Sequence, residues 1–164
     1  MSKKNPSRDE ALEAIDFIVN VLKEHEKDLD KLIGELGTIT DKLGDTGEFS
    51  GKIEKVEDGY ALLTMNVEEK HLQFLKTVHG GAIASLADSA AAWATVGSTG
   101  LEAVPITVEM KINFLAPVES GRLIAEARIV HKGKTISLSD VEVKDDKGRL
   151  VAKSLVTYYL RSNQ

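Results

Sequence analysis

The sequence contains no cysteine. This absence excludes disulfide bonds, a thiolate nucleophile and thiolate metal sites, and it is compatible with a reducing compartment. Long hydrophobic runs are also missing, because none approaches the roughly 18–20 apolar residues that a membrane span needs. The N-terminal residues carry the positive charges of a signal peptide, but no apolar segment follows them. We therefore expect a cytoplasmic protein that does not insert into a membrane.

Positive charge is scarce as well. The chain has 21 lysines and arginines against 26 aspartates and glutamates, which gives a net charge of −5 at pH 7. Proteins that bind nucleic acid usually carry a basic surface, whereas acids and bases are interleaved along this chain. The composition therefore argues against a nucleic-acid partner, and 164 residues with 42% hydrophobic content predict a single core of ordinary size.

The first 45 residues are predicted to form an N-terminal helical extension. Ser7 and Glu10 have the spacing of a capping box, which closes two free backbone donors at the start of a helix. The heptads that follow are too few and too often interrupted for a long coiled coil. We expect one or two helices that cover the domain or a second subunit. Apolar residues recur at seven-residue intervals at Ile15, Leu22, Leu29, Leu36 and Leu43.

Residues 46–164 are predicted to form one α+β domain. Within it, an alanine-rich stretch at residues 79–97 is apolar on nearly every side, which predicts a helix buried all round. The segments on either side alternate between polar and apolar residues, as strands do, and are joined by hairpin turns that favour antiparallel pairing. An antiparallel sheet that curls around the helix would bury both elements. The expected strands are 52–56, 60–67, 104–114, 123–130, 135–143 and 150–160.

Asp88 fits poorly with the middle of this alanine-rich helix. Aspartate is a weak helix former away from a helix N-terminus, and it is almost never fully buried without a partner. In one interpretation Asp88 lies on a solvated stripe with Ser85 and Ser89, or bonds to Ser85. In the other it is held in a largely dry crevice, where loss of water favours the protonated carboxyl and suits it to act as a general base.

The turn His79-Gly80-Gly81 begins the same helix. The first N–H groups of a helix have no partner within the helix and lie at the positive end of its dipole. Two glycines leave this backbone uncovered, so a carbonyl oxygen could approach and be stabilised as an oxyanion. A glycine-rich turn with no ligand is the alternative. His79 and Asp88 are nine residues apart, roughly 13 Å along a helix, so one site that uses both needs two chains.

Other catalytic signatures are missing from the sequence. There is no Gly-x-Ser-x-Gly elbow of the kind that presents a nucleophilic serine. The four histidines are scattered, without the spacing of a metal site, so we expect no bound metal. His25 is expected on a solvated helix, and His71 and His131 in loops.

The segment TVHGGAIASLAD, from Thr77 to Asp88, resembles the signature of hotdog-fold thioesterases of the phenylacetate-degradation (PaaI-like) type. The strand VEMKINFLAP, residues 108–117, is similar as well, and the resemblance covers about residues 46–160. It implies a hotdog fold, in which an antiparallel sheet wraps around a central helix. It also implies homodimers with a continuous sheet, which often pair again into tetramers. The implied substrate is an acyl-CoA, with no cofactor other than the CoA of the substrate.

The resemblance further implies roles for individual residues. Gly80 would donate its N–H to the thioester oxygen, and Asp88 would be the nucleophile or the general base that activates water. Gln73 would orient that water or polarise the thioester, and Thr107 would help to position the water. The chain departs from its relatives at Lys76, where they commonly have glycine, and this lysine would alter the loop or place a cation near the CoA phosphates.

These patterns predict an acyl-CoA thioesterase that releases a free acid and CoA at a subunit interface. One alternative is a hotdog dehydratase acting on hydroxyacyl thioesters, in which His79 would pair with an acid. The other is a non-catalytic acyl-CoA-binding module whose N-terminal helices bind DNA, although residues 1–45 hold 7 basic and 11 acidic residues, a balance of −4. The predicted catalytic residues are Asp88, Gly80, Gln73, His79 and Thr107. The predicted substrate-binding residues are Gly81, Lys76, Arg122, Lys132 and Lys134, with Arg128 as a further candidate phosphate contact.

Overall fold

A computed structural model describes residues 51–100 and 103–162, together with Asn20 and Lys27, which both lie in helix. The rest of the predicted N-terminal extension and its boundary at residue 45 lie outside the described residues. Two strands, β1 (Lys52–Glu57) and β2 (Tyr60–Asn66), precede the 3-10 helix η1 (Glu69–His71) and the long helix α2 (Gly80–Thr99). Four strands follow: β3 (Ala103–Phe114), β4 (Arg122–Lys132), β5 (Ile136–Asp145) and β6 (Leu150–Ser162).

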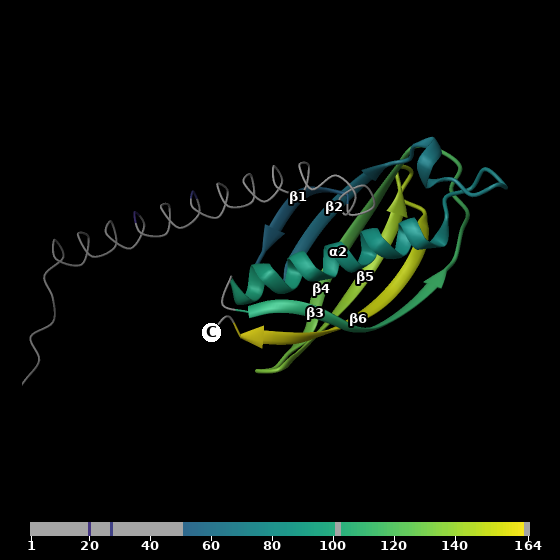
Figure 1. The fold of residues 1–164 in the computed structure, drawn as a ribbon. Helices are drawn as coiled ribbons and strands as arrows, with labels where there is room; N and C mark the ends of the chain where they lie inside the picture. Colours follow the sequence, from purple (N-terminus) through teal and green to yellow (C-terminus); the bar gives the residue numbers. More distant parts are fainter. Residues whose placement is uncertain (1–19, 21–26, 28–50, 101–102, 163–164) are drawn as a thin grey trace, which may run out of the picture. The chain divides into compact units, whose positions relative to one another are not determined.

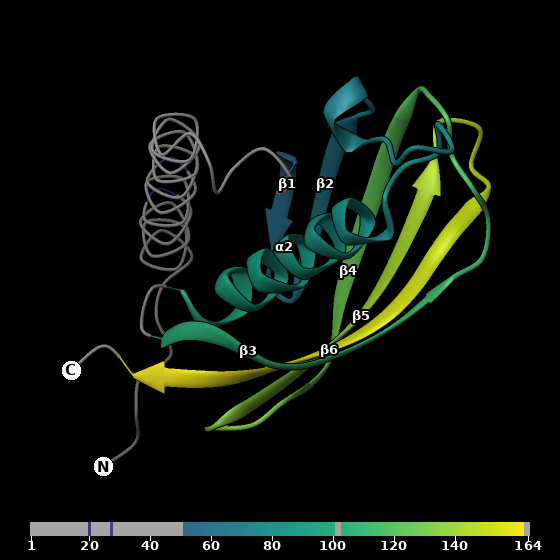
Figure 2. The same cartoon turned by 45° about the vertical axis from the view of Figure 1, so that its right-hand side comes forward.

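The six strands form one antiparallel sheet in the order β1-β2-β4-β5-β6-β3. Tight turns join the consecutive hairpins, and Gly59 and Gly148 adopt the positive φ angles of 70° and 78° that two of these turns require. The sheet curves, and α2 lies across its concave side (Figures 1 and 2). This arrangement confirms the expected hotdog fold, with β1 and β3 as the two edges of the sheet.

Small side chains allow α2 to approach the sheet closely. The helix contacts all six strands, and five of its seven alanines are buried on the side that faces the sheet: Ala82, Ala87, Ala90, Ala91 and Ala94. The closest approach is at Gly97, where a Cβ atom would lie 2.2 Å from the backbone oxygen of Glu57. Fully buried side chains in this core include Leu63, Leu86, Leu123, Val141, Val143, Val156 and Tyr158.

The prediction that α2 is buried all round is wrong for the single chain. Gly81 and Ser85 are exposed, and Asp88, Ser89 and Ala92 are only half-buried. The reason is that the sheet covers one side of the helix and leaves the other side open. The open side carries small and polar residues, so its burial depends on something other than this sheet.

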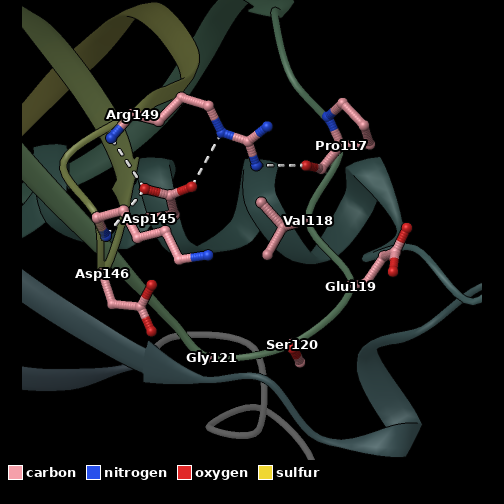
Figure 3. Close-up of a pocket in the computed structure, with 9 residues that line it drawn as sticks. Pro117, Val118, Glu119, Ser120, Gly121, Asp145, Asp146 and Arg149 are labelled. Carbon is pink, nitrogen blue, oxygen red and sulfur yellow. Dashed lines mark hydrogen bonds and ion pairs between the residues drawn. The ribbon is translucent and has the colours of Figure 1, made fainter.

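A polar cluster fixes the β5–β6 turn to the connection between β3 and β4. The Asp145 carboxylate accepts hydrogen bonds from the backbone N–H of Lys147 (3.0 Å) and from the backbone N–H and Nε of Arg149 (both 2.9 Å). The Arg149 guanidinium reaches on to the carbonyl of Pro117, at 2.8 Å (Figure 3). The neighbouring residue Val118 accepts a hydrogen bond from Val78, directly before the His79 turn, at 2.7 Å. The cluster therefore supports the segment that starts α2.

All six predicted strands are present, with ends that differ by one or two residues. The loop positions predicted for His71 and His131 are wrong. His131 lies in β4 and pairs with Leu138 after a bulge, because the strand continues beyond the predicted end. His71 ends η1 and is only 2% exposed, with its Nδ1 accepting from the Glu68 backbone. No helix among residues 51–100 and 103–162 is long and apolar enough to cross a membrane.

Candidate functional site

The Asp88 carboxylate is held by two hydroxyl groups from the sheet. Thr107 in β3 donates from Oγ1, which lies 3.1 Å from Oδ1 and 3.2 Å from Oδ2 of Asp88. Tyr158 in β6 places its hydroxyl 2.8 Å from Oδ1 and 2.5 Å from the backbone oxygen of Asp88. Two neutral donors thus hold the carboxylate in a fixed orientation, which suits a nucleophile or a general base.

A β-bulge brings Thr107 to this position. The register of β3 against β6 shifts between Thr107 and Glu109, so that Val108 is the extra residue on the β3 side. Bulges redirect side chains and are common beside active sites. Thr107 is the partner of Tyr158 across the two strands, which explains why both hydroxyls meet at one carboxylate.

Neither interpretation of Asp88 from the sequence describes its surroundings fully. The side chain is half-buried rather than fully dry, and its hydrogen-bond partners among the described residues come from β3 and β6, not from Ser85. Sequence reasoning missed Tyr158, because the alternation of β6 points it inward and makes it resemble an ordinary core residue. A buried tyrosine needs a hydrogen-bond partner for its hydroxyl, so an inward-facing tyrosine in the sequence indicates a polar group close to it.

The His79 turn is rigidly placed at the start of α2. His79 is the N-cap residue, and its Nδ1 accepts a hydrogen bond from the Gly81 N–H at 3.0 Å. Its backbone N–H donates to the carbonyl of His71, at 2.8 Å, and its carbonyl accepts from Ala82, at 2.9 Å. The Gly81 N–H therefore already has a partner. Among residues 51–100 and 103–162, no acceptor is found for the Gly80 N–H.

Gln73 and Lys76 lie in a tight loop before this turn. The loop is closed by hydrogen bonds from Gln73 to the carbonyl and the hydroxyl of Thr77, at 2.8 and 2.7 Å. Lys76 has a φ of 62°, the only positive value at a non-glycine residue in the described part of the chain. This conformation favours glycine, the residue that the family resemblance implies for this position. The Lys76 ammonium forms an ion pair with Glu69.

A small, mainly apolar pocket of about 370 Å³ opens beside the start of α2. Its lining includes Gly81 and Ser85, which share a helix face with Asp88 because they lie seven and three residues before it. The pocket thus lies on the open side of the helix. Its lining residues are Lys70, Leu72, His79, Gly81, Ala82 and Ser85.

The predicted cationic residues do not gather at one place within the chain. Arg122 and Lys132 lie at the two ends of β4, roughly 33 Å apart for ten steps along a strand. Lys132 donates to the carbonyl (2.6 Å) and the hydroxyl (2.9 Å) of Ser98, near the C-terminus of α2, where a cation is favourable. Arg128 pairs with Glu126 and lies 4.5 Å from the centre of the Tyr60 ring.

Lys134 makes no hydrogen bond or ion pair within the described part of the chain. In the same part of the chain, no group of three or more His, Cys, Asp or Glu side chains could hold a metal ion. The Asp88 cluster offers a carboxylate and two hydroxyls, and the start of α2 offers the backbone N–H of Gly80.

A family model of the thioesterase superfamily matches residues 75–152, which contain the His79 turn, Asp88 and Thr107. The acyl-coenzyme A thioesterase PaaI of Escherichia coli is 37% identical over 101 residues, 61% of this chain and 70% of that protein. Human acyl-coenzyme A thioesterase 13 is 31% identical over 114 residues, 67% of this chain and 81% of that protein. The chain belongs to the thioesterase superfamily.

The fold agrees with this membership. A thioesterase from Streptococcus pneumoniae, solved with coenzyme A, superposes with a TM-score of 0.63 at 26% identity, over 67% of this chain and 84% of that one. The protein is thus a PaaI-like thioesterase, a thioester hydrolase with the hotdog fold. Of the functions considered from the sequence, thioester hydrolysis is the one that these relatives support.

Proposed function

We propose that this thioesterase hydrolyses an acyl-CoA at an interface between two copies of the chain. In this proposal the Gly80 N–H of one subunit binds the thioester oxygen, and Asp88 of the other subunit acts as nucleophile or as general base. The observation that carries the proposal is the Asp88 carboxylate, held by Thr107 and Tyr158 on the open side of α2. The relatives named for acyl-coenzyme A thioester hydrolysis support the substrate class.

The hydrogen bonding of the Gly80 and Gly81 N–H groups supports Gly80 as the oxyanion donor. Its N–H lies at the positive end of the α2 dipole and has no acceptor among the described residues, whereas the Gly81 N–H is bonded to His79. An oxyanion that forms during attack on a thioester gains most from such a preorganised donor. We assign His79 the task of fixing the turn, through its N-cap bond. Gly81 then contributes an uncovered backbone surface to the substrate pocket.

The distance along α2 supports a site made by two subunits. Gly80 and Asp88 are eight residues apart, roughly 12 Å along the helix axis. A reacting carbonyl must lie within about 3–3.5 Å of its nucleophile, so one chain cannot place both groups on the same thioester. A second copy that brings its own α2 alongside would resolve this conflict.

The exposed apolar residues support such a pairing. Strand β3 is a sheet edge of 12 residues, and it exposes Val104, Ile106 and Val108. A long, apolar edge strand invites pairing with another strand, and here the partner would be the β3 strand of a second copy. The open side of α2 would then be covered by that copy. We propose a homodimer as the minimal unit and a tetramer as the working assembly.

The remaining predicted residues receive narrower roles in this proposal. Gln73 can orient water with its side-chain oxygen, or polarise the thioester with the second hydrogen of its amide, since one amide N–H bonds to Thr77. Thr107 positions Asp88 and the water. Among the cations, Lys134 and Arg122 are the candidates for the CoA phosphates, because Lys76 and Lys132 already contact Glu69 and Ser98. The reaction needs no cofactor beyond the CoA of the substrate, and we place the enzyme in the cytoplasm.

The test is steady-state hydrolysis of a panel of acyl-CoAs, from acetyl through long-chain to phenylacetyl and hydroxybenzoyl. Free CoA can be followed with a thiol reagent, because the protein has no cysteine to react with it. We expect Asp88→Asn to lower kcat at least about a hundredfold on the preferred substrate, with the oligomer unchanged. The matched control is Asp58→Asn, at an exposed aspartate in the β1–β2 turn, which should leave activity unchanged.

Two outcomes would contradict the proposal. If no thioester in the panel is hydrolysed, the acyl-CoA assignment fails. If Asp88→Asn hydrolyses the preferred substrate as fast as wild type, the assigned role of Asp88 fails. Sedimentation of the wild-type protein tests the assembly separately, since a fully active monomer would exclude a site shared by two subunits.

A further inference from the structure

Tyr158 reaches the candidate catalytic carboxylate from inside the core. Its side chain points inward from β6 and is 1% exposed, yet its hydroxyl lies 2.8 Å from Oδ1 of Asp88 and 2.5 Å from the backbone oxygen of the same residue. A phenol has a single hydroxyl hydrogen, so only one of these two oxygens can accept it at a time. The two acceptors are therefore alternatives for one donor.

We propose that Tyr158 is a positioning residue that holds Asp88 through both states of the reaction. While the carboxylate is ionised, the Tyr158 O–H donates to Oδ1. When Asp88 loses its charge, by taking a proton from the attacking water or by forming an acyl bond to the thioester carbon as the C–S bond breaks and CoA leaves as its thiolate, the same O–H turns to the Asp88 carbonyl. This role rests on the proposed function of Asp88. The proton stays on Tyr158 throughout, and no buried donor is left without an acceptor in either state.

The surroundings of the hydroxyl support a donor that never ionises. Burial, together with the adjacent Asp88 carboxylate, raises the pKa of the Tyr158 hydroxyl far above its ordinary value. The O–H therefore stays protonated at neutral pH. The hydroxyl is enclosed, with Oδ1 and the backbone oxygen of Asp88 as its acceptors and the Thr107 hydroxyl beside it.

Within residues 51–100 and 103–162, no other ionisable side chain faces this cluster from the elements packed around it. Asp88 is the only ionisable residue of α2. On β3, Glu109 bonds to Thr157, on the face of the sheet away from the helix, and Lys111 is exposed. On β5 and β6, Asp140, Glu142 and Lys153 form their own ion pairs, Lys144 pairs with Glu142, and Arg161 is exposed.

The arrangement also distinguishes the two carboxylate oxygens of Asp88. Tyr158 contacts Oδ1 but not Oδ2, whereas the single hydroxyl hydrogen of Thr107 is shared between Oδ1 at 3.1 Å and Oδ2 at 3.2 Å. Oδ2 thus keeps more of its lone-pair capacity for a water molecule or a thioester carbon. We infer that Oδ2 is the reacting oxygen and that Oδ1 is the oxygen by which the sheet holds the side chain.

The test is Tyr158→Phe, which keeps the ring and removes only the hydroxyl. We expect kcat to fall about ten- to hundredfold, as is typical for the loss of a hydrogen bond to a charged group, with KM changed less than about twofold. The loss should fall on kcat and not on KM, because the hydroxyl holds the Asp88 carboxylate and is itself buried. The matched control is Tyr159→Phe, the neighbouring residue, which points outward, is 40% exposed and should behave as wild type.

A purely structural role predicts a different result. It would lower the fraction of folded enzyme, as thermal unfolding would reveal, but leave the kcat of the folded fraction unchanged. An unchanged kcat per folded enzyme in Tyr158→Phe would therefore overturn the proposal. If Asp88→Asn is slow while Tyr158→Phe is normal, only the role of Tyr158 fails. If Asp88→Asn is as fast as wild type, the proposed function fails and the role of Tyr158 fails with it.

Discussion

At Gly97, α2 packs closely against the β1–β2 hairpin. The substitution Gly97→Ala adds one methyl group there, and its effect on the free energy of unfolding tests how tight the packing is. In Gly97→Ala, the new Cβ would lie 2.2 Å from the backbone oxygen of Glu57 and 2.8 Å from Cγ1 of Val56. A carbon and an oxygen normally stay more than 3 Å apart, and a backbone oxygen cannot rotate away as a side chain can. The helix and the hairpin must therefore separate.

Two opposing effects set the size of the result. Replacing glycine with alanine inside a helix normally stabilises it by about 1 kcal/mol. Overpacking a tight interface costs about 1–3 kcal/mol, and a clash with backbone belongs at the upper end of that range. We therefore expect Gly97→Ala to lower the free energy of unfolding by about 2 kcal/mol, which is a decrease in Tm of about 8 °C for a domain of this size.

Thermal and urea unfolding, followed by circular dichroism, give both quantities. The control is Ser85→Ala, at an exposed position of the same helix, where alanine should be neutral or slightly stabilising. If Gly97→Ala is as stable as wild type, or more stable, the helix does not lie against the hairpin as described. The reasoning about small residues in α2 would then be refuted.

Three further changes test other parts of the structure. Ser139 has a buried hydroxyl without a partner among the described residues, so Ser139→Ala should raise the free energy of unfolding in urea by about 1 kcal/mol, and a loss would contradict this. The Arg149 backbone amide, with the other donors of its turn, lowers the pKa of Asp145 below its ordinary value. Asp145→Asn should therefore destabilise the domain at neutral pH, and the difference in urea midpoint should shrink as the pH falls below about 4, since the carboxylate stabilises only while it is ionised. A constant difference across that range would exclude the charge as the cause. Thr107→Val should lower kcat about tenfold, because Asp88 loses one donor, whereas Thr107→Ser should stay close to wild type. An equal fall in kcat in both variants would attribute the effect to packing and not to the hydroxyl.

The sequence by itself determined the secondary structure and the candidate turn. Alternation of polar and apolar residues located all six strands, because one face of each strand lies toward the helix, although β1 and β3 at the sheet edges are at most half-buried. The alanine-rich run located α2 for the same reason. Glycines at Gly80 and Gly81, and an aspartate among alanines at Asp88, violate the local rules of helix formation, and such violations commonly mark a functional site.

Tertiary structure alone decided which groups meet at Asp88 and which parts of α2 stay open. Thr107 reaches the carboxylate because of a bulge against β6, and the local sequence pattern does not predict a bulge. Tyr158 has the inward position of any core residue, and its partner lies 70 residues earlier in the chain. The sheet covers one side of α2 only, which the composition of the helix does not specify. The local sequence determines the period of polar and apolar residues in each element. These contacts depend instead on strand order and register, which are set by residues far apart in the chain.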